Sequence, residues 1–185
     1  FTPLVNEAAD GNAALDWVAG KSWCNGRVGL WGRSYLGIVQ MPAAAGGHEV
    51  LTCIAPSVAP GSYFRDWLRY DGCFALANAV SWSLTHATCR TQPAMQHFDW
   101  GELHRLDGIE AISERVGFSN QTLQRWAEHD TYDDMWCGLD WDRHYAHIAI
   151  PGFHRGDWFD HLTRTQYESV RALRGDQKLL IGSWG

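Results

Sequence analysis

The spacing of apolar residues predicts alternating helices and strands in the first third of the chain. Apolar positions recur at helical spacing in residues 6–20, and two short apolar runs, 27–31 and 50–55, are typical of buried strands. Residues 35–45, rich in small and apolar side chains, predict a second helix, which ends at a pair of glycines. Helices and strands that alternate in this way build a parallel sheet with helices on its faces.

The pattern changes in the middle of the chain, where strand signals become scarce. Helical spacing dominates there, in residues 74–84, 108–116 and 122–129. The alternation then returns as a strand, a helix and a strand, at 147–154, 160–173 and 177–182. We therefore predict an α/β core formed by residues 1–62 and 146–185, with an inserted helical cap at 63–145.

Composition narrows the classes of protein and of partner. The 185 residues are 45% hydrophobic and 19% charged, which fits a folded globular domain. The net charge of −6, without a basic cluster, argues against a nucleic-acid partner, and no apolar run is long enough to span a membrane. The five cysteines are scattered and odd in number, so we expect buried apolar thiols, no disulfide framework and a reducing, cytoplasmic location.

A serine between two glycines marks the junction of the first predicted strand and the helix after it. Gly32 and Gly37 flank Ser34, and small neighbours of this kind are typical of a nucleophile elbow, a strained turn that pushes a serine hydroxyl outward. The backbone N–H of Tyr35, at the start of the helix, could then stabilise an oxyanion. An ordinary turn is the alternative.

The residues around this serine resemble a known family. The run DWVAGKSWCNGRVGLWGRSYLGIVQ is similar to the nucleophile region of the cocaine esterase / X-prolyl dipeptidyl-peptidase (CocE/NonD-type) family of α/β-hydrolases. The similarity includes the second glycine, which comes one place later than in the usual Gly-x-Ser-x-Gly pattern. Three later segments agree in the same order: YDGCFALANAVSW, IPGFHRGDWFDHLTRTQYESV and QKLLIGSWG. The resemblance implies an α/β-hydrolase core, a mostly parallel sheet with a helical cap, of which this chain is an internal fragment truncated at both ends.

The resemblance also implies a catalytic acid and a base. It assigns the acid to Asp160, although that residue could instead cap the helix after it, and Asp157 stands where the family usually has glycine. The histidine base is expected just beyond Gly185. No metal or other cofactor is expected, because His154, Asp157 and His161 do not have the spacing of a tight ligand motif.

These features predict a serine hydrolase that cleaves esters or amides through an acyl-enzyme, most simply an esterase of the cocaine esterase type. An X-prolyl dipeptidyl-peptidase or an α-amino acid ester hydrolase is the enzymatic alternative, and an inactive hydrolase-fold binding module is the non-enzymatic one. The expected partner is a small ester or peptide, and a homodimer of the full-length protein is left open. Four aromatic residues could form the pocket for an apolar acyl group or simply fill the cap core: Trp67, Phe74, Trp82 and Trp158.

Overall fold

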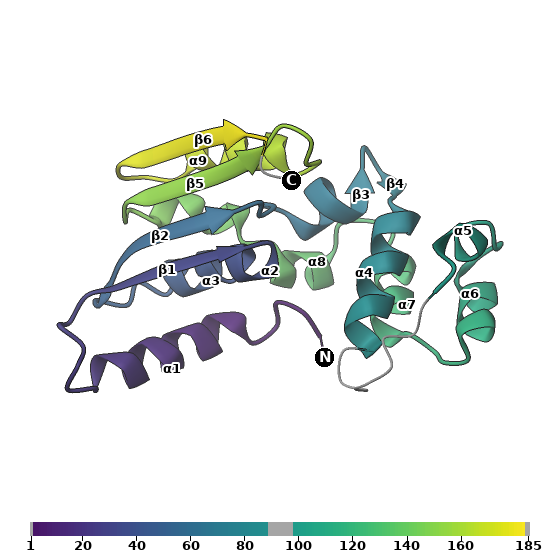
Figure 1. Ribbon diagram of the computed structural model, residues 1–185, viewed down its shortest axis with the longest axis horizontal. Coiled ribbons are helices and arrows are strands. Elements are labelled where there is room, and N and C mark those ends of the chain that lie inside the picture. The colour runs from purple at the N-terminus through teal and green to yellow at the C-terminus, as the bar shows by residue number, and fades with distance from the viewer. Residues whose placement is uncertain (1, 89–97, 184–185) are drawn as a thin grey trace.

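Four parallel strands form the central sheet in the computed structural model, which describes residues 2–88 and 98–183 (Figure 1). The strand order is β1-β2-β5-β6, and each neighbouring pair is parallel. The strands are β1 (Val28–Arg33), β2 (Leu51–Ser57), β5 (Gly152–Asp157) and β6 (Gln177–Gly182). Their carboxyl ends share one edge of the sheet, and in Figure 1 this edge faces the helices from the middle of the chain.

Helices cover one face of the sheet. They are α1 (Glu7–Ala19), α2 (Tyr35–Ile38), α3 (Gln40–Ala45) and α9 (Thr163–Ala172). α3 packs on β2, α9 packs on β5 and β6, and α1 packs on α3. The core between sheet and helices includes Leu15, Met41 and Ile54. On the opposite face, the side chains of Trp31, Phe153 and Leu180 are exposed.

A mostly helical excursion connects β2 to β5 and lies beside the carboxyl edge of the sheet (Figure 1). Its elements are the π-helix η1 (Phe64–Leu68), β3 (Arg69–Tyr70), β4 (Cys73–Phe74), α4 (Leu76–Thr88), α5 (Trp100–Leu103), α6 (Ile109–Val116), α7 (Gln121–Glu128), α8 (Asp134–Leu139) and the 3-10 helix η2 (Asp142–His147). The last element, η2, packs instead against α3 and α9 on the covered face of the sheet. The core of the other elements also takes in Ile38 and Leu162 from the sheet side. The division into a separate cap at 63–145 stays a prediction. Within the described ranges, no helix is long and apolar enough to cross a membrane.

Two predicted elements differ from the structure, and one observed element was not predicted. The helix at 35–45 is divided at Val39, because Pro42 has no N–H to donate to the carbonyl four residues before it. The strand predicted from residue 147 begins at Gly152, since η2 ends at His147 and residues 148–151 form a connection that is neither helix nor strand. The β3–β4 hairpin was not predicted, although Asp71 and Gly72 both have positive φ, as a two-residue type I′ turn requires.

The prediction of buried cysteines is wrong for the four cysteines that the structure describes. Cys53 and Cys73 are exposed, and Cys24 and Cys137 are partly buried; all four are free thiols. Cys53 alternates with the buried Ile54 along β2, so its side chain lies on the uncovered face of the sheet. The fifth, Cys89, lies outside the described residues.

Candidate active site

Ser34 occupies a strained turn between β1 and α2. Its φ of 57° and ψ of −125° lie in a region that non-glycine residues rarely adopt, at a cost of about 1–3 kcal/mol. Backbone hydrogen bonds hold the turn: the Ser34 N–H donates to the carbonyl of Ser57 at 2.9 Å, and the Ser34 carbonyl accepts from the N–H groups of Gly37 and Ile38. This backbone conformation is the one expected for a nucleophile elbow.

The two glycines beside Ser34 are required by close packing. A Cβ on Gly32 would lie 2.5 Å from the Cβ of Leu36, and a Cβ on Gly37 would lie 2.9 Å from the carbonyl oxygen of Ser57. Real Cβ atoms essentially never approach other atoms this closely. The helix after Ser34 therefore folds back tightly against the strands, which explains why the second glycine comes three residues after the serine.

Ser34 lines a cavity of about 420 Å³ at the carboxyl edge of the sheet. Four other residues predicted for the site also line it: Tyr35, Trp67, Trp82 and Asp160. The described lining is completed by seven residues that the sequence did not single out: Arg33, Ile38, Val58, Pro60, Tyr63, His161 and Leu162. The structure thus brings the serine, the carboxylate and two predicted tryptophans to one place.

Asp160 is held by the turn between β5 and α9. Its Oδ1 accepts the N–H of Leu162 at 2.8 Å, and the Nδ1 of His161 lies 3.8 Å from the same oxygen. α9 begins only at Thr163, and its N-cap residue, Leu162, makes no side-chain cap. Asp160 is therefore not the N-cap of α9; its carboxylate holds the turn before that helix, and the residue lines the cavity. Asp157, the other carboxylate considered, is 2% exposed and does not line this cavity.

Phe74 and Trp158 do not line the cavity, contrary to the predicted pocket. Phe74 lies in the β3–β4 hairpin, where its ring packs under the guanidinium of Arg69, 4.9 Å from the ring centre. Trp158 follows the last residue of β5 and donates its backbone N–H to the carbonyl of Gly182, with its side chain 65% exposed. The turn after β5 presents Asp160, His161 and Leu162 to the cavity rather than the tryptophan.

One wall of the cavity is aromatic. The rings of Tyr63 and Trp67 meet edge to face at 4.8 Å, and Trp67 meets Trp82 in the same way at 5.3 Å. Trp126 lies behind this wall, 5.6 Å from both tryptophans. Burial raises the pKa of the Tyr63 hydroxyl well above its ordinary value, and the nearby Tyr35 adds to that. The wall therefore stays uncharged and suits an apolar or aromatic group.

The side chain of Tyr35 ties the elbow to the start of the chain. Its hydroxyl donates to the carboxylate of Glu7 and accepts the backbone N–H of Leu4. Burial, reinforced by the Glu7 carboxylate, raises the pKa of the Tyr35 hydroxyl. The residue after Ser34 is thus fixed at its side chain as well as at its backbone.

The described histidines separate into different environments. His154, on β5, is fully buried, with Nδ1 2.8 Å from the Gln166 amide nitrogen and Nε2 2.9 Å from the Gln177 amide oxygen. Burial lowers its pKa, so it packs as a neutral core residue. His161 lines the cavity. Within residues 2–88 and 98–183, no three metal-binding side chains cluster. The histidine predicted beyond Gly185 stays a prediction.

Two sequence signals could have identified more of the lining. Tyr63 lies shortly after the carboxyl end of β2, and His161 directly follows the predicted acid, so both lie at the sheet edge where ligands bind in open α/β folds. Glu7 had no such signal, because its contact with Tyr35 joins residues far apart in the sequence.

Known proteins are similar to this chain in sequence and in fold. The X-Pro dipeptidyl-peptidase (S15) family matches residues 1–185. The cocaine esterase of Rhodococcus sp. (strain MB1 Bresler) is 24% identical over 204 residues, which cover all of this chain and 35% of the esterase. The Xaa-Pro dipeptidyl-peptidase of Lactobacillus helveticus (strain DPC 4571) is 29% identical over 87 residues, which cover 39% of this chain and 11% of the peptidase.

A similar fold occurs in a solved CocE/NonD family hydrolase from Staphylococcus aureus, with a TM-score of 0.72 and 19% identity over 98% of this chain and 29% of that one. This chain therefore spans about a third of the length of the cocaine esterase and of that hydrolase. The parallel sheet is that of an α/β-hydrolase core. Because the family match extends over the whole sequence, the chain belongs to the X-Pro dipeptidyl-peptidase (S15) family, whose members are hydrolases.

Proposed function

We propose that this chain carries the nucleophile and the acid of a serine hydrolase that cleaves esters or amides through an acyl-enzyme. The observation that carries the proposal is the strained backbone of Ser34, which lines the same cavity as Asp160. In this proposal, Ser34 attacks the carbonyl carbon, and the N–H of Tyr35, the first residue of α2, stabilises the oxyanion.

Asp160 would orient a histidine base contributed from beyond Gly185. A neutral serine hydroxyl is a weak nucleophile at neutral pH, so its proton must pass to a base while the bond to carbon forms. The histidine then returns that proton to the leaving group, and water repeats the sequence to release the acid. The chain order serine, acid, histidine is the order usual in α/β-hydrolases.

The cavity favours an ester or amide with an apolar or aromatic acyl group, as in an esterase of the cocaine esterase type. Tyr63, Trp67 and Trp82 supply the apolar wall. A dipeptidyl-peptidase or an α-amino acid ester hydrolase would also need a carboxylate to bind the substrate ammonium. Asp160 is the carboxylate among the described lining residues, and the proposed triad uses it. This favours the esterase over those two alternatives.

A fluorophosphonate probe tests the proposed nucleophile, because attack by an activated serine expels fluoride and leaves a stable serine–phosphorus bond. We expect rapid labelling of the full-length protein and no labelling of the Ser34→Ala variant, with the adduct located on Ser34 by mass spectrometry. Removing a triad member leaves only about 10³–10⁴-fold acceleration over water, so the isolated 185-residue chain should be labelled far more slowly.

Two outcomes would contradict parts of this proposal. Rapid labelling of the 185-residue chain would mean that a base is already present within it, and a His161→Ala variant would then show whether the cavity histidine is that base. Absence of labelling in the full-length protein, when the fold is intact by circular dichroism, would favour an inactive binding module.

A further inference from the structure

The aromatic wall of the cavity rests on an unusual element. Tyr63 and Trp67 belong to or adjoin the π-helix Phe64–Leu68, which follows β2 at the carboxyl edge of the sheet. π-Helices are rare and short, and they occur frequently at functional sites. The first N–H groups of any helix lack partners within it, so the start of this one needs acceptors from elsewhere.

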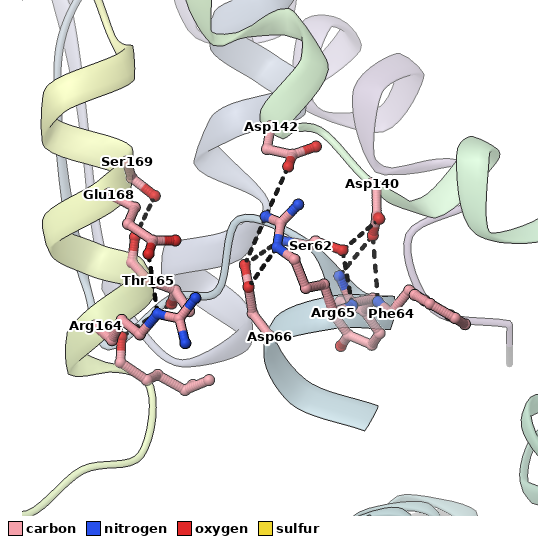
Figure 2. A network of polar contacts seen from close by, with 12 residues as sticks. Ser62, Phe64, Arg65, Asp66, Asp140, Asp142, Arg164, Thr165, Glu168 and Ser169 are labelled. Atoms are coloured by element: carbon pink, nitrogen blue, oxygen red, sulfur yellow. Dashed lines mark hydrogen bonds and ion pairs between the residues drawn. The ribbon is translucent and has the colours of Figure 1, made fainter. Parts of the chain in front are cut away.

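Asp140, at the end of α8, supplies those acceptors from a distant part of the chain (Figure 2). Its Oδ1 accepts the N–H of Tyr63 at 2.6 Å, and its Oδ2 accepts the hydroxyl of Ser62. The N–H of Phe64 lies 3.5 Å from Oδ1 as a weaker third contact. Asp140 is only 2% exposed, so these bonds form away from bulk water.

A second layer of contacts closes the same turn. The Oγ of Ser62 accepts the N–H of Arg65 at 3.0 Å, and the Asp66 carboxylate accepts the N–H of Ser62 at 2.8 Å. Figure 2 shows that these bonds converge on Ser62 and that the Arg65 guanidinium bridges Asp66 to Asp142. The inner part of this network is buried, whereas the Arg65 side chain is 54% exposed.

The network acts on the cavity only through the helix that it holds. Asp140 and Ser62 do not line the cavity, but Tyr63 and Trp67 do. Both rings are buried, and Trp67 is wedged between Tyr63 and Trp82. A small shift of the start of the π-helix would therefore move the part of the wall that an acyl group contacts. Ser34 and Asp160 would keep their places, because they lie in the turns that follow β1 and β5.

We propose that Asp140, acting with Ser62, is a positioning residue that sets the selectivity of the cavity for bulky aromatic acyl groups. This inference rests on the proposed function, since selectivity is read out with ester substrates. Its effect should be confined to substrates that reach the aromatic wall. A small acyl group such as acetyl lies near Ser34 and should not sense the change.

The test compares 4-nitrophenyl benzoate with 4-nitrophenyl acetate in the full-length protein. We expect Asp140→Ala to lower the ratio of the two kcat/KM values by about tenfold, mainly through KM for the benzoate. Asp140→Asn keeps one acceptor oxygen and should restore part of the ratio. Asp142→Asn is the matched control, since Asp142 bonds only to the exposed Arg65 guanidinium in this network and should leave the ratio unchanged.

Two further measurements keep the result decisive. If Asp140→Ala does not fold, Ser62→Ala, which removes one hydroxyl, takes its place and should lower the ratio in the same direction. An unchanged ratio, or an equal loss on both esters in a folded variant, would overturn the proposal. Calorimetric titration with 1-naphthoate measures binding at the wall without catalysis. Weaker binding to the Asp140 and Ser62 variants than to Asp142→Asn supports the proposal even if neither ester is cleaved. Equal binding to all of them contradicts it.

Discussion

Five tryptophans of this chain form two groups with opposite environments, whereas others, such as Trp82 and Trp141, are half-buried. In the excursion, Trp67, Trp126 and Trp136 are at most 8% exposed, and their rings contact one another or neighbouring aromatic rings. Near the sheet, Trp31 and Trp158 are 83% and 65% exposed. The same residue type therefore serves as core in one region and as surface in the other.

The difference arises from what each region has to pack. Most helices of the excursion are short, so tertiary packing holds them together, and buried aromatic rings form part of that core beside leucine and isoleucine side chains. In residues 2–88 and 98–183, helices cover one face of the sheet, and Trp31 projects from the other face, beside Phe153. Aromatic content alone therefore does not locate a binding cavity. Whether a ring lines a cavity depends on the helices and strands that pack around it.

Replacing a buried tryptophan should produce the largest difference between the two regions. Trp136 is fully buried, and its Nε1–H donates to the carbonyl of His129 at 2.8 Å. We expect Trp136→Ala to lower the free energy of unfolding by about 3–5 kcal/mol, because it opens a cavity and leaves that carbonyl unpaired. Trp31→Ala should change it by less than about 0.5 kcal/mol. Urea denaturation measures both, and equal losses would contradict the comparison.

The buried region also holds a carboxylate whose ionisation should affect stability. Burial raises the pKa of Asp140 to about 6, although hydrogen bonds from Ser62 and Tyr63 oppose the rise. The charged groups Asp142, Asp66 and Arg65 lie nearby, as do the hydroxyls of Tyr132 and Tyr145.

An unfolded aspartate titrates near pH 4, so between about pH 4 and pH 6 the folded protein keeps a proton that the unfolded chain has lost. The free energy of unfolding should therefore fall as the pH rises through this window, by about 3 kcal/mol from this group. Asp140→Asn should remove that part of the pH dependence. Denaturation curves at several pH values measure it, and parallel profiles for the two proteins would refute the assignment.

The smallest expected effect is a difference in substrate selectivity between variants of a buried and of an exposed tryptophan. If the cavity receives the acyl group, Trp67→Ala should lower the benzoate-to-acetate ratio of kcat/KM by about tenfold, because it removes apolar contact area from the wall. Trp158→Ala should leave the ratio within about twofold. Steady-state kinetics of the full-length protein gives both values. A larger loss in Trp158→Ala would restore that residue to the pocket.

The serine turn was predictable because its signal is local. An apolar strand, two glycines and a small-residue helix all lie within Val28–Ala45, and the backbone strain at Ser34 follows from them. The parallel sheet was likewise expected, because helices and strands alternate at both ends of the chain. The division of the 35–45 helix was also visible in principle, since Pro42 lacks a donor.

The remaining parts of the site depend on contacts across long stretches of sequence. Tyr63 and Trp67 reach the cavity because Asp140 holds the π-helix from the far end of the excursion. Phe74 was misassigned because the hairpin turns its ring toward Arg69. A period in the sequence shows which face of an element is apolar, but not which distant element will cover it.

The placement of the excursion has a consequence for how the sequence of such a chain can change in evolution. β2 and β5 are neighbours in the sheet, yet the whole excursion separates Ser57 from Gly152. The entropic cost of closing a loop rises only slowly with its length, by about 0.6 kcal/mol for each doubling. A change in the length of the excursion therefore costs the sheet that holds Ser34 and Asp160 little in chain entropy. The aromatic wall of the cavity can therefore vary while Ser34 and Asp160 keep their positions.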